Sequence, residues 1–87
     1  MKQIVVEVTQ EDIDKGGHYV EDCPIARALQ RTVENTRAWV GPDTFGISDW
    51  RNSRAGMTPE SASEWMRMYD DGFKPMQPAT FTFTFDS

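Results

Sequence analysis

The chain has 87 residues, of which 38% are hydrophobic and 26% are charged. A chain of this length builds one core, and these proportions are typical of a globular domain rather than a disordered tail. We therefore expect a single domain over residues 1–87. The net charge of −5 argues against general nucleic-acid binding, because a phosphate backbone is bound by a basic face. It favours a protein or small-molecule partner.

The single cysteine and the absence of long apolar runs exclude further classes of protein. One cysteine, Cys23, forms no internal disulfide and builds no multi-cysteine zinc site. The opening residues contain no apolar run of signal-peptide length. No segment approaches the ~18–20 apolar residues that span a bilayer. We therefore expect a cytoplasmic protein that does not enter the membrane.

The first third of the chain predicts one strand and two helices. In residues 3–8, one face of an extended chain carries Ile4, Val6 and Val8 and the other carries Val5 and Glu7, which predicts a strand with one buried face. Thr9 suits a helix N-cap, and the glycines at 16–17 end that short helix. A second helix is expected from Pro24, at the first helical position, to about Asn35.

The middle of the chain predicts a hairpin and a loop. Residues 37–41 are typical of a strand, 41–44 of a tight turn and 45–48 of a short third strand. The rest of this region, residues 49–57, is predicted to be a polar loop.

The last third predicts one helix and one strand. Thr58 followed by proline and an acid is typical of a capped helix start, and Gly72 suits its left-handed end. Residues 80–85 alternate strictly between threonine and phenylalanine. They predict a strand with three rings facing the core, Phe81, Phe83 and Phe85.

These elements define an α+β fold in the order β-α-α-β-β-α-β. The simplest architecture is a small antiparallel or mixed sheet with the helices packed on one face. We expect the first and last strands to be neighbours. A homodimer is also compatible with the sequence, because an exposed edge of the threonine-rich last strand could pair with a second copy.

The residues that carry most enzyme chemistry are sparse. His18 is the only histidine and has no evident catalytic or metal-binding partner, so we interpret it as a loop residue. Cys23 could be a nucleophile at a helix N-terminus, but a packing and capping role is favoured. The clustered acids do not have calcium-loop spacing and suit helix starts. They are Glu11, Asp12, Asp14, Glu21 and Asp22. We therefore expect no enzyme activity, metal or cofactor.

One segment is typical of a binding surface. Residues 48–56 place Trp50, Arg51 and Arg54 in the predicted loop. Tryptophan and arginine are enriched in protein-binding hot spots, and the same residues can stack a base and hold a phosphate. Arg27 and Arg31 could extend this positive patch. The alternative is an ordinary loop whose tryptophan packs into the core.

Three segments resemble a family of small uncharacterised bacteriophage and prophage accessory proteins. They are VEVTQEDIDKG at 6–16, CPIARAL at 23–29, and DDGFKP followed by FTF within 70–83. The stretch from 39 to 57 departs from the family pattern. The resemblance implies a phage origin and a bacterial cytoplasm, but it implies no activity.

Two functions are compatible with these observations. The first is an interaction protein that binds and inhibits a bacterial host or defence protein, as an anti-CRISPR protein does, since an acidic surface can occupy a basic cleft. The alternative is a nucleotide-binding or nucleotide-sequestering protein, in which the arginines hold phosphates and Trp50 stacks on the base.

Overall fold

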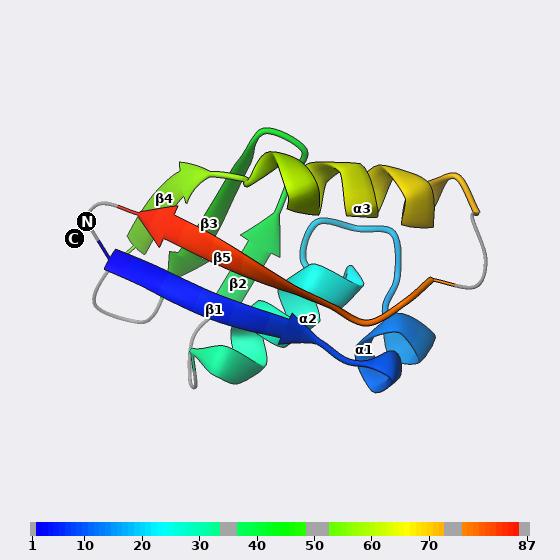
Figure 1. Ribbon diagram of the computed structural model, residues 1–87. Coiled ribbons are helices and arrows are strands. Elements are labelled where there is room, and N and C mark those ends of the chain that lie inside the picture. Colours follow the sequence, from blue (N-terminus) through cyan, green and yellow to red (C-terminus); the bar gives the residue numbers. More distant parts are fainter. Residues whose placement is uncertain (1, 34–36, 49–52, 73–75, 86–87) are drawn as a thin grey trace.

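The computed structural model describes residues 2–33, 37–48, 53–72 and 76–85 (Figure 1). Its elements are β1 (Lys2–Val8), α1 (Gln10–Lys15), α2 (Pro24–Thr32), β2 (Arg37–Val40), β3 (Thr44–Ser48), β4 (Ser53–Met57), α3 (Glu60–Asp70) and β5 (Ala79–Phe85). The α+β class is confirmed, with antiparallel pairing and one strand more than predicted. None of the helices described here is long and apolar enough to cross a bilayer.

The strands form two sheets. β1 and β5 pair antiparallel over their whole length, with Ile4 opposite Phe83 and Val6 opposite Phe81. This pairing confirms that the first and last strands are neighbours. The other sheet is the antiparallel meander β2-β3-β4. In Figure 1, β5 runs between β1 and the meander.

β4 corrects the prediction of a polar loop over residues 49–57. Residues 53–57 form a strand that pairs with β3, while 49–52 lie outside the described residues. The sequence Ser-Arg-Ala-Gly-Met has no β-branched or aromatic residue, so it lacks the composition of a strand. Tertiary pairing decides the conformation here, because β3 offers an adjacent edge for backbone hydrogen bonds.

Gly56 allows β4 to approach β5 closely. A Cβ atom at this position would lie 2.6 Å from the carbonyl oxygen of Thr84 and 2.9 Å from a ring carbon of Phe45. Both neighbours are fixed, so Gly56→Ala should lower the free energy of unfolding by about 1–3 kcal/mol. Denaturant unfolding measures the loss. The exposed neighbour provides the control, since Ala55→Ser should change stability by less than about 0.5 kcal/mol. Equal stabilities would contradict the close approach.

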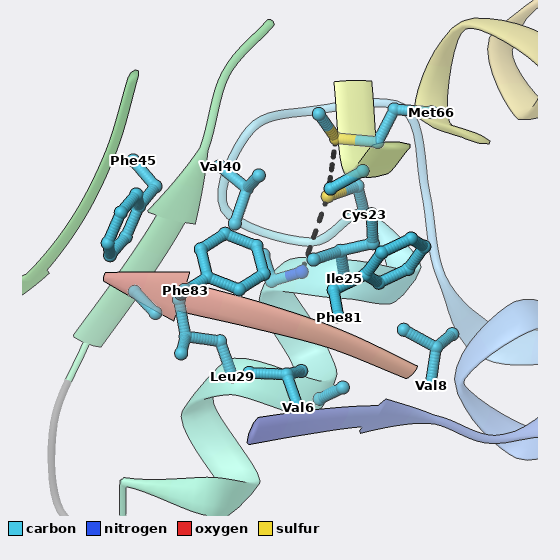
Figure 2. Packing of buried hydrophobic residues seen from close by; sticks show 14 residues of the cluster. Val6, Val8, Cys23, Ile25, Leu29, Val40, Phe45, Met66, Phe81 and Phe83 are labelled. Atoms are coloured by element: carbon cyan, nitrogen blue, oxygen red, sulfur yellow. Dashed lines mark hydrogen bonds between the residues drawn. The ribbon is translucent and has the colours of Figure 1, made fainter. Parts of the chain in front are cut away.

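The hydrophobic core lies between the strands and α2 (Figure 2). α2 buries almost its whole apolar stripe, and it packs against both β1 and β2. Phe45 of β3 meets Phe83 of β5 edge to face, with ring centroids 4.7 Å apart. Phe81 is buried as predicted, whereas the side chain of Phe85 lies outside the described part. The phenylalanine strand therefore joins the two sheets through one core.

The helix starts agree with the predicted signals except at α3, and α2 ends at Thr32, earlier than the predicted end near Asn35. Thr9 caps α1 and Pro24 occupies the first position of α2, as predicted. Gly72 has φ of +83°, which confirms the left-handed end of α3. The predicted cap at Thr58 is wrong. Pro59 is the N-cap residue, and the Thr58 hydroxyl instead donates a hydrogen bond to the Gly41 carbonyl at 2.9 Å.

Candidate functional site

A short loop holds two apolar side chains in solvent. In this loop, residues 17–22, the Asp22 carboxylate accepts a hydrogen bond from the Tyr19 N–H at 3.0 Å. The Val40 N–H of β2 donates to the Val20 carbonyl at 2.8 Å, which fixes the loop to the sheet. The side chains of Tyr19 and Val20 are nevertheless 78% and 48% exposed. An ordered backbone therefore presents apolar surface to water.

A groove of about 330 Å³ lies between this loop and α3. Cys23, Val40 and Met66 line it and are themselves buried. Figure 2 shows the sulfur atoms of Cys23 and Met66 facing each other near Val40. Tyr19 and Val20 also line the groove. It therefore has an apolar floor and exposed apolar side chains on one wall.

The second wall is charged and is connected to the first through His18. His18 Nδ1 lies 2.9 Å from Asp70 Oδ1 of α3. The His18 ring lies against Tyr69, with centroids 5.0 Å apart. Arg67 and Asp71 complete the polar lining on the side of α3. These contacts join the loop to the helix at one place, so the groove walls have a defined spacing.

The thiol of Cys23 has a structural role at the start of α2. Its Sγ accepts the Ala26 N–H at 3.4 Å, which caps the helix, and it lies 3.8 Å from the Met66 sulfur. Burial raises the pKa of the Cys23 thiol above its ordinary value. The thiol is therefore protonated at neutral pH, and a protonated thiol is a poor nucleophile.

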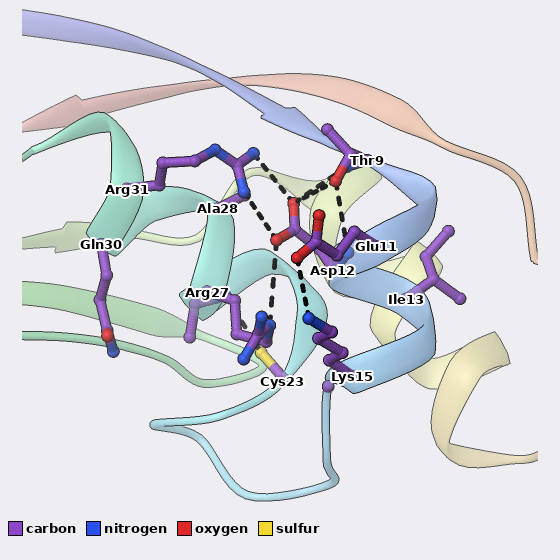
Figure 3. A network of polar contacts seen from close by, with 12 residues as sticks. Thr9, Glu11, Asp12, Ile13, Lys15, Cys23, Arg27, Ala28, Gln30 and Arg31 are labelled. Carbon is purple, nitrogen blue, oxygen red and sulfur yellow. Dashed lines mark hydrogen bonds and ion pairs between the residues drawn. The ribbon is translucent and has the colours of Figure 1, made fainter.

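A second polar cluster surrounds the buried carboxylate of Asp12 (Figure 3). Arg31 of α2 donates to both carboxylate oxygens, at 2.7 and 2.9 Å, and also to the Glu7 carbonyl at 2.8 Å. Thr9 donates to Asp12 through its N–H and its hydroxyl. Burial alone would raise the pKa of Asp12, but the hydrogen bonds from Arg31 and Thr9 outweigh it and hold the pKa below the usual value. The cluster ties α1 and β1 to α2.

The predicted binding arginines are divided between two places. Arg27 and Arg31 lie one turn apart on α2 and both face Asp12, with Arg27 Nε 3.9 Å from the carboxylate. Arg54 is partly buried on β4, in the meander sheet. Trp50 and Arg51 lie outside the described residues, so their proposed role stays a prediction.

Sequence reasoning missed Tyr19 and Val20. Their one signal is two adjacent apolar residues inside a polar stretch that runs from glycine 16 to aspartate 22. An apolar pair at such a place can turn inward or outward. The hydrogen bond from Val40, 20 positions further along the chain, decides the outcome.

No metal site emerges from the described ranges, in which no three His, Cys, Asp or Glu side chains are grouped to hold an ion. Comparison with protein-family models, with curated proteins and with solved structures gives no match. The groove is therefore interpreted from its own geometry.

Proposed function

We propose that this protein acts by binding another protein and that the groove between residues 17–22 and α3 is its docking site. The observation that supports this most directly is the exposure of Tyr19 and Val20 on an ordered loop beside an apolar floor. Tyrosine is enriched at binding hot spots, because it buries a large ring while its hydroxyl finds a polar partner. A fixed loop also loses little conformational entropy on binding.

The partner that we propose is a bacterial host protein, which the chain would inhibit during phage infection. The resemblance of three segments to phage accessory proteins supports the setting. The net charge of −5 supports a target with a basic surface, such as the nucleic-acid cleft of a defence protein. In this proposal the apolar groove receives a side chain of the target, while acidic residues around it meet basic ones.

The arrangement of the arginines gives less support to nucleotide binding. Three donor contacts of Arg31 already go to Asp12 and to the Glu7 carbonyl. A phosphate group at this place would have to compete with a buried carboxylate that is bound in two-pronged geometry. Protein binding therefore remains the function that the geometry supports best.

Affinity capture from a bacterial lysate with matched variants tests the groove. Tyr19→Ala removes an exposed ring and should leave the fold intact, yet it should weaken binding by roughly 30-fold or more if the ring is a hot spot. Met57→Ala is the control, because Met57 is also exposed, at 76%, but does not line the groove. We expect one stoichiometric protein to be retained by the wild type and by the control, and to be lost with Tyr19→Ala.

Three other results would count against this assignment. Equal capture by all three proteins would exclude the groove. Loss on changing Trp50 and Arg54 to alanine, with Tyr19→Ala still binding, would move the interface to residues 48–56. No partner above background, together with a nucleotide released on denaturing the purified protein, would replace protein binding with nucleotide binding.

A further inference from the structure

β1 lies on the outside of the β1–β5 pair. Figure 1 shows β5 between β1 and the meander, and β1 pairs with β5 alone in the described part of the chain. The homodimer considered from the sequence used the last strand, but that strand is internal to the arrangement. Of these two strands, β1 therefore has the edge that faces away from the meander.

The backbone groups of β1 that face away from β5 can be identified. The Glu7 carbonyl accepts a side-chain bond from Arg31. Two residues further on, the Thr9 N–H donates to the Asp12 carboxylate and its carbonyl accepts the Ile13 N–H. Alternate residues of an antiparallel strand direct their N–H and C=O groups to the same edge. Gln3 and Val5 therefore share the outer edge with Glu7.

We propose that β1 pairs antiparallel with β1 of a second copy, about a two-fold axis at Val5. This register places Gln3 opposite Glu7 of the second copy and Val5 opposite its own equivalent. Ile4 then lies opposite Val6 on the core face. The outward-directed backbone groups of Gln3, Val5 and Glu7 then all have hydrogen-bonding partners. The result is a four-stranded sheet in the order β5-β1-β1-β5. Such an interface is isologous, as expected for a two-fold dimer.

Charge and polarity favour a second copy in this register. Glu7 is the one charged residue from position 3 to position 7, and the register sets it against a neutral amide. A shift that placed Glu7 opposite its own equivalent would bring like charges together. A shift by one residue would turn the apolar face of one copy toward solvent. Val5 is 59% exposed and would be covered by its equivalent at the axis.

The bond from Arg31 does not prevent this pairing. A carbonyl oxygen has two lone pairs, so the Glu7 carbonyl can accept the guanidinium and a strand N–H together. The outer edge of β1 carries no proline and no lysine between positions 3 and 7. These are the residues with which proteins commonly prevent edge-to-edge association. Nothing in this stretch of sequence therefore opposes a second strand.

The test is the mass of the protein in solution. Sedimentation equilibrium over a wide concentration range should approach twice the chain mass of 10.0 kDa. Val5→Lys places two ammonium groups at the axis and should return the mass to that of one chain. Thr82→Lys is the matched control. It adds the same charge on the strand partner of Val5, one strand further from the axis, and should remain dimeric.

Amide hydrogen exchange gives a second readout that does not depend on any variant. The Val5 N–H should exchange more slowly as the protein concentration rises, because dimerisation pairs it. A wild type that stays at the mass of one chain at millimolar concentration would overturn the proposal. So would a dimer that Val5→Lys leaves intact while both variants show wild-type circular dichroism.

Discussion

Phe83→Ala should lower the free energy of unfolding by about 3–5 kcal/mol. The Phe83 side chain is fully buried, lies edge to face against Phe45 and pairs across the strands with Ile4. Truncation removes the transfer energy of the ring and leaves a cavity between two sheets. The sheets approach each other closely through fixed backbone at Gly56, so the cavity cannot collapse without moving a strand.

A graded series makes this prediction measurable. A chain of this size has a total stability of about 4–13 kcal/mol, so the alanine variant is close to unfolding. Phe83→Leu keeps much of the volume and should cost about 1–1.5 kcal/mol. Thr82→Ala changes the adjacent exposed residue and should stay within about 0.5 kcal/mol of the wild type. Equal losses at 82 and 83 in denaturant unfolding would contradict the assignment of the buried face.

The first and last strands could be predicted because their sequence pattern and their environment agree. β5 alternates threonine with phenylalanine, and its buried positions are those of the rings. β1 shows the same alternation with valine at its buried positions. Period-2 patterning specifies which face is buried whenever one face meets the core. The core face of this pair packs against α2 at β1 and against the meander at β5.

β4 shows where local sequence is insufficient. Its residues favour a loop, and its exposure alternates with no apolar face to mark it. Its identity as a strand depends on pairing with β3 and on the close approach to β5 that a glycine allows. β3 directly precedes β4 in the chain, but β5 begins more than 20 residues later, at Ala79, so the close approach at Gly56 cannot be inferred from local sequence.

The groove was beyond prediction for a related reason. It forms because His18 reaches Asp70, 52 positions away, and because Val20 is bound to β2. From the sequence, His18 is an isolated loop residue with no evident partner. The contact between loop and helix creates a concave surface from residues that individually indicate no function.

Asp12 also illustrates how a correct local interpretation can be incomplete. As an acid in the first turn of a helix it suits the helix dipole, and in the structure it also forms a capping box with Thr9. Its larger role comes from Arg31, 19 residues away. A carboxylate that accepts two hydrogen bonds from one guanidinium stabilises the folded protein more than an exposed charge at a helix start does.

Asp12→Asn should therefore lower the free energy of unfolding by about 2–3 kcal/mol, the cost expected when buried hydrogen bonds to a charged group are lost. The amide keeps the shape of the side chain but not its charge, and its NH₂ group cannot accept a bond from Arg31. Asp14→Asn is the control on the same helix, because Asp14 is exposed. It should change stability by no more than about 0.5 kcal/mol.

The difference between wild type and Asp12→Asn should depend on pH in one direction. The pKa of Asp12 in the folded protein is held below its ordinary value of 3.8. Above that value the carboxylate is charged in both states, and the stabilisation is complete. As the pH falls below it, the unfolded chain takes up a proton first, and the stabilisation is lost through the folded pKa. Denaturant unfolding of both proteins from neutral pH to about pH 3 should therefore show the two stabilities converging. A difference that stays constant over this range would contradict the lowered pKa, because it would mean that the ionisation of Asp12 does not contribute to the stability difference.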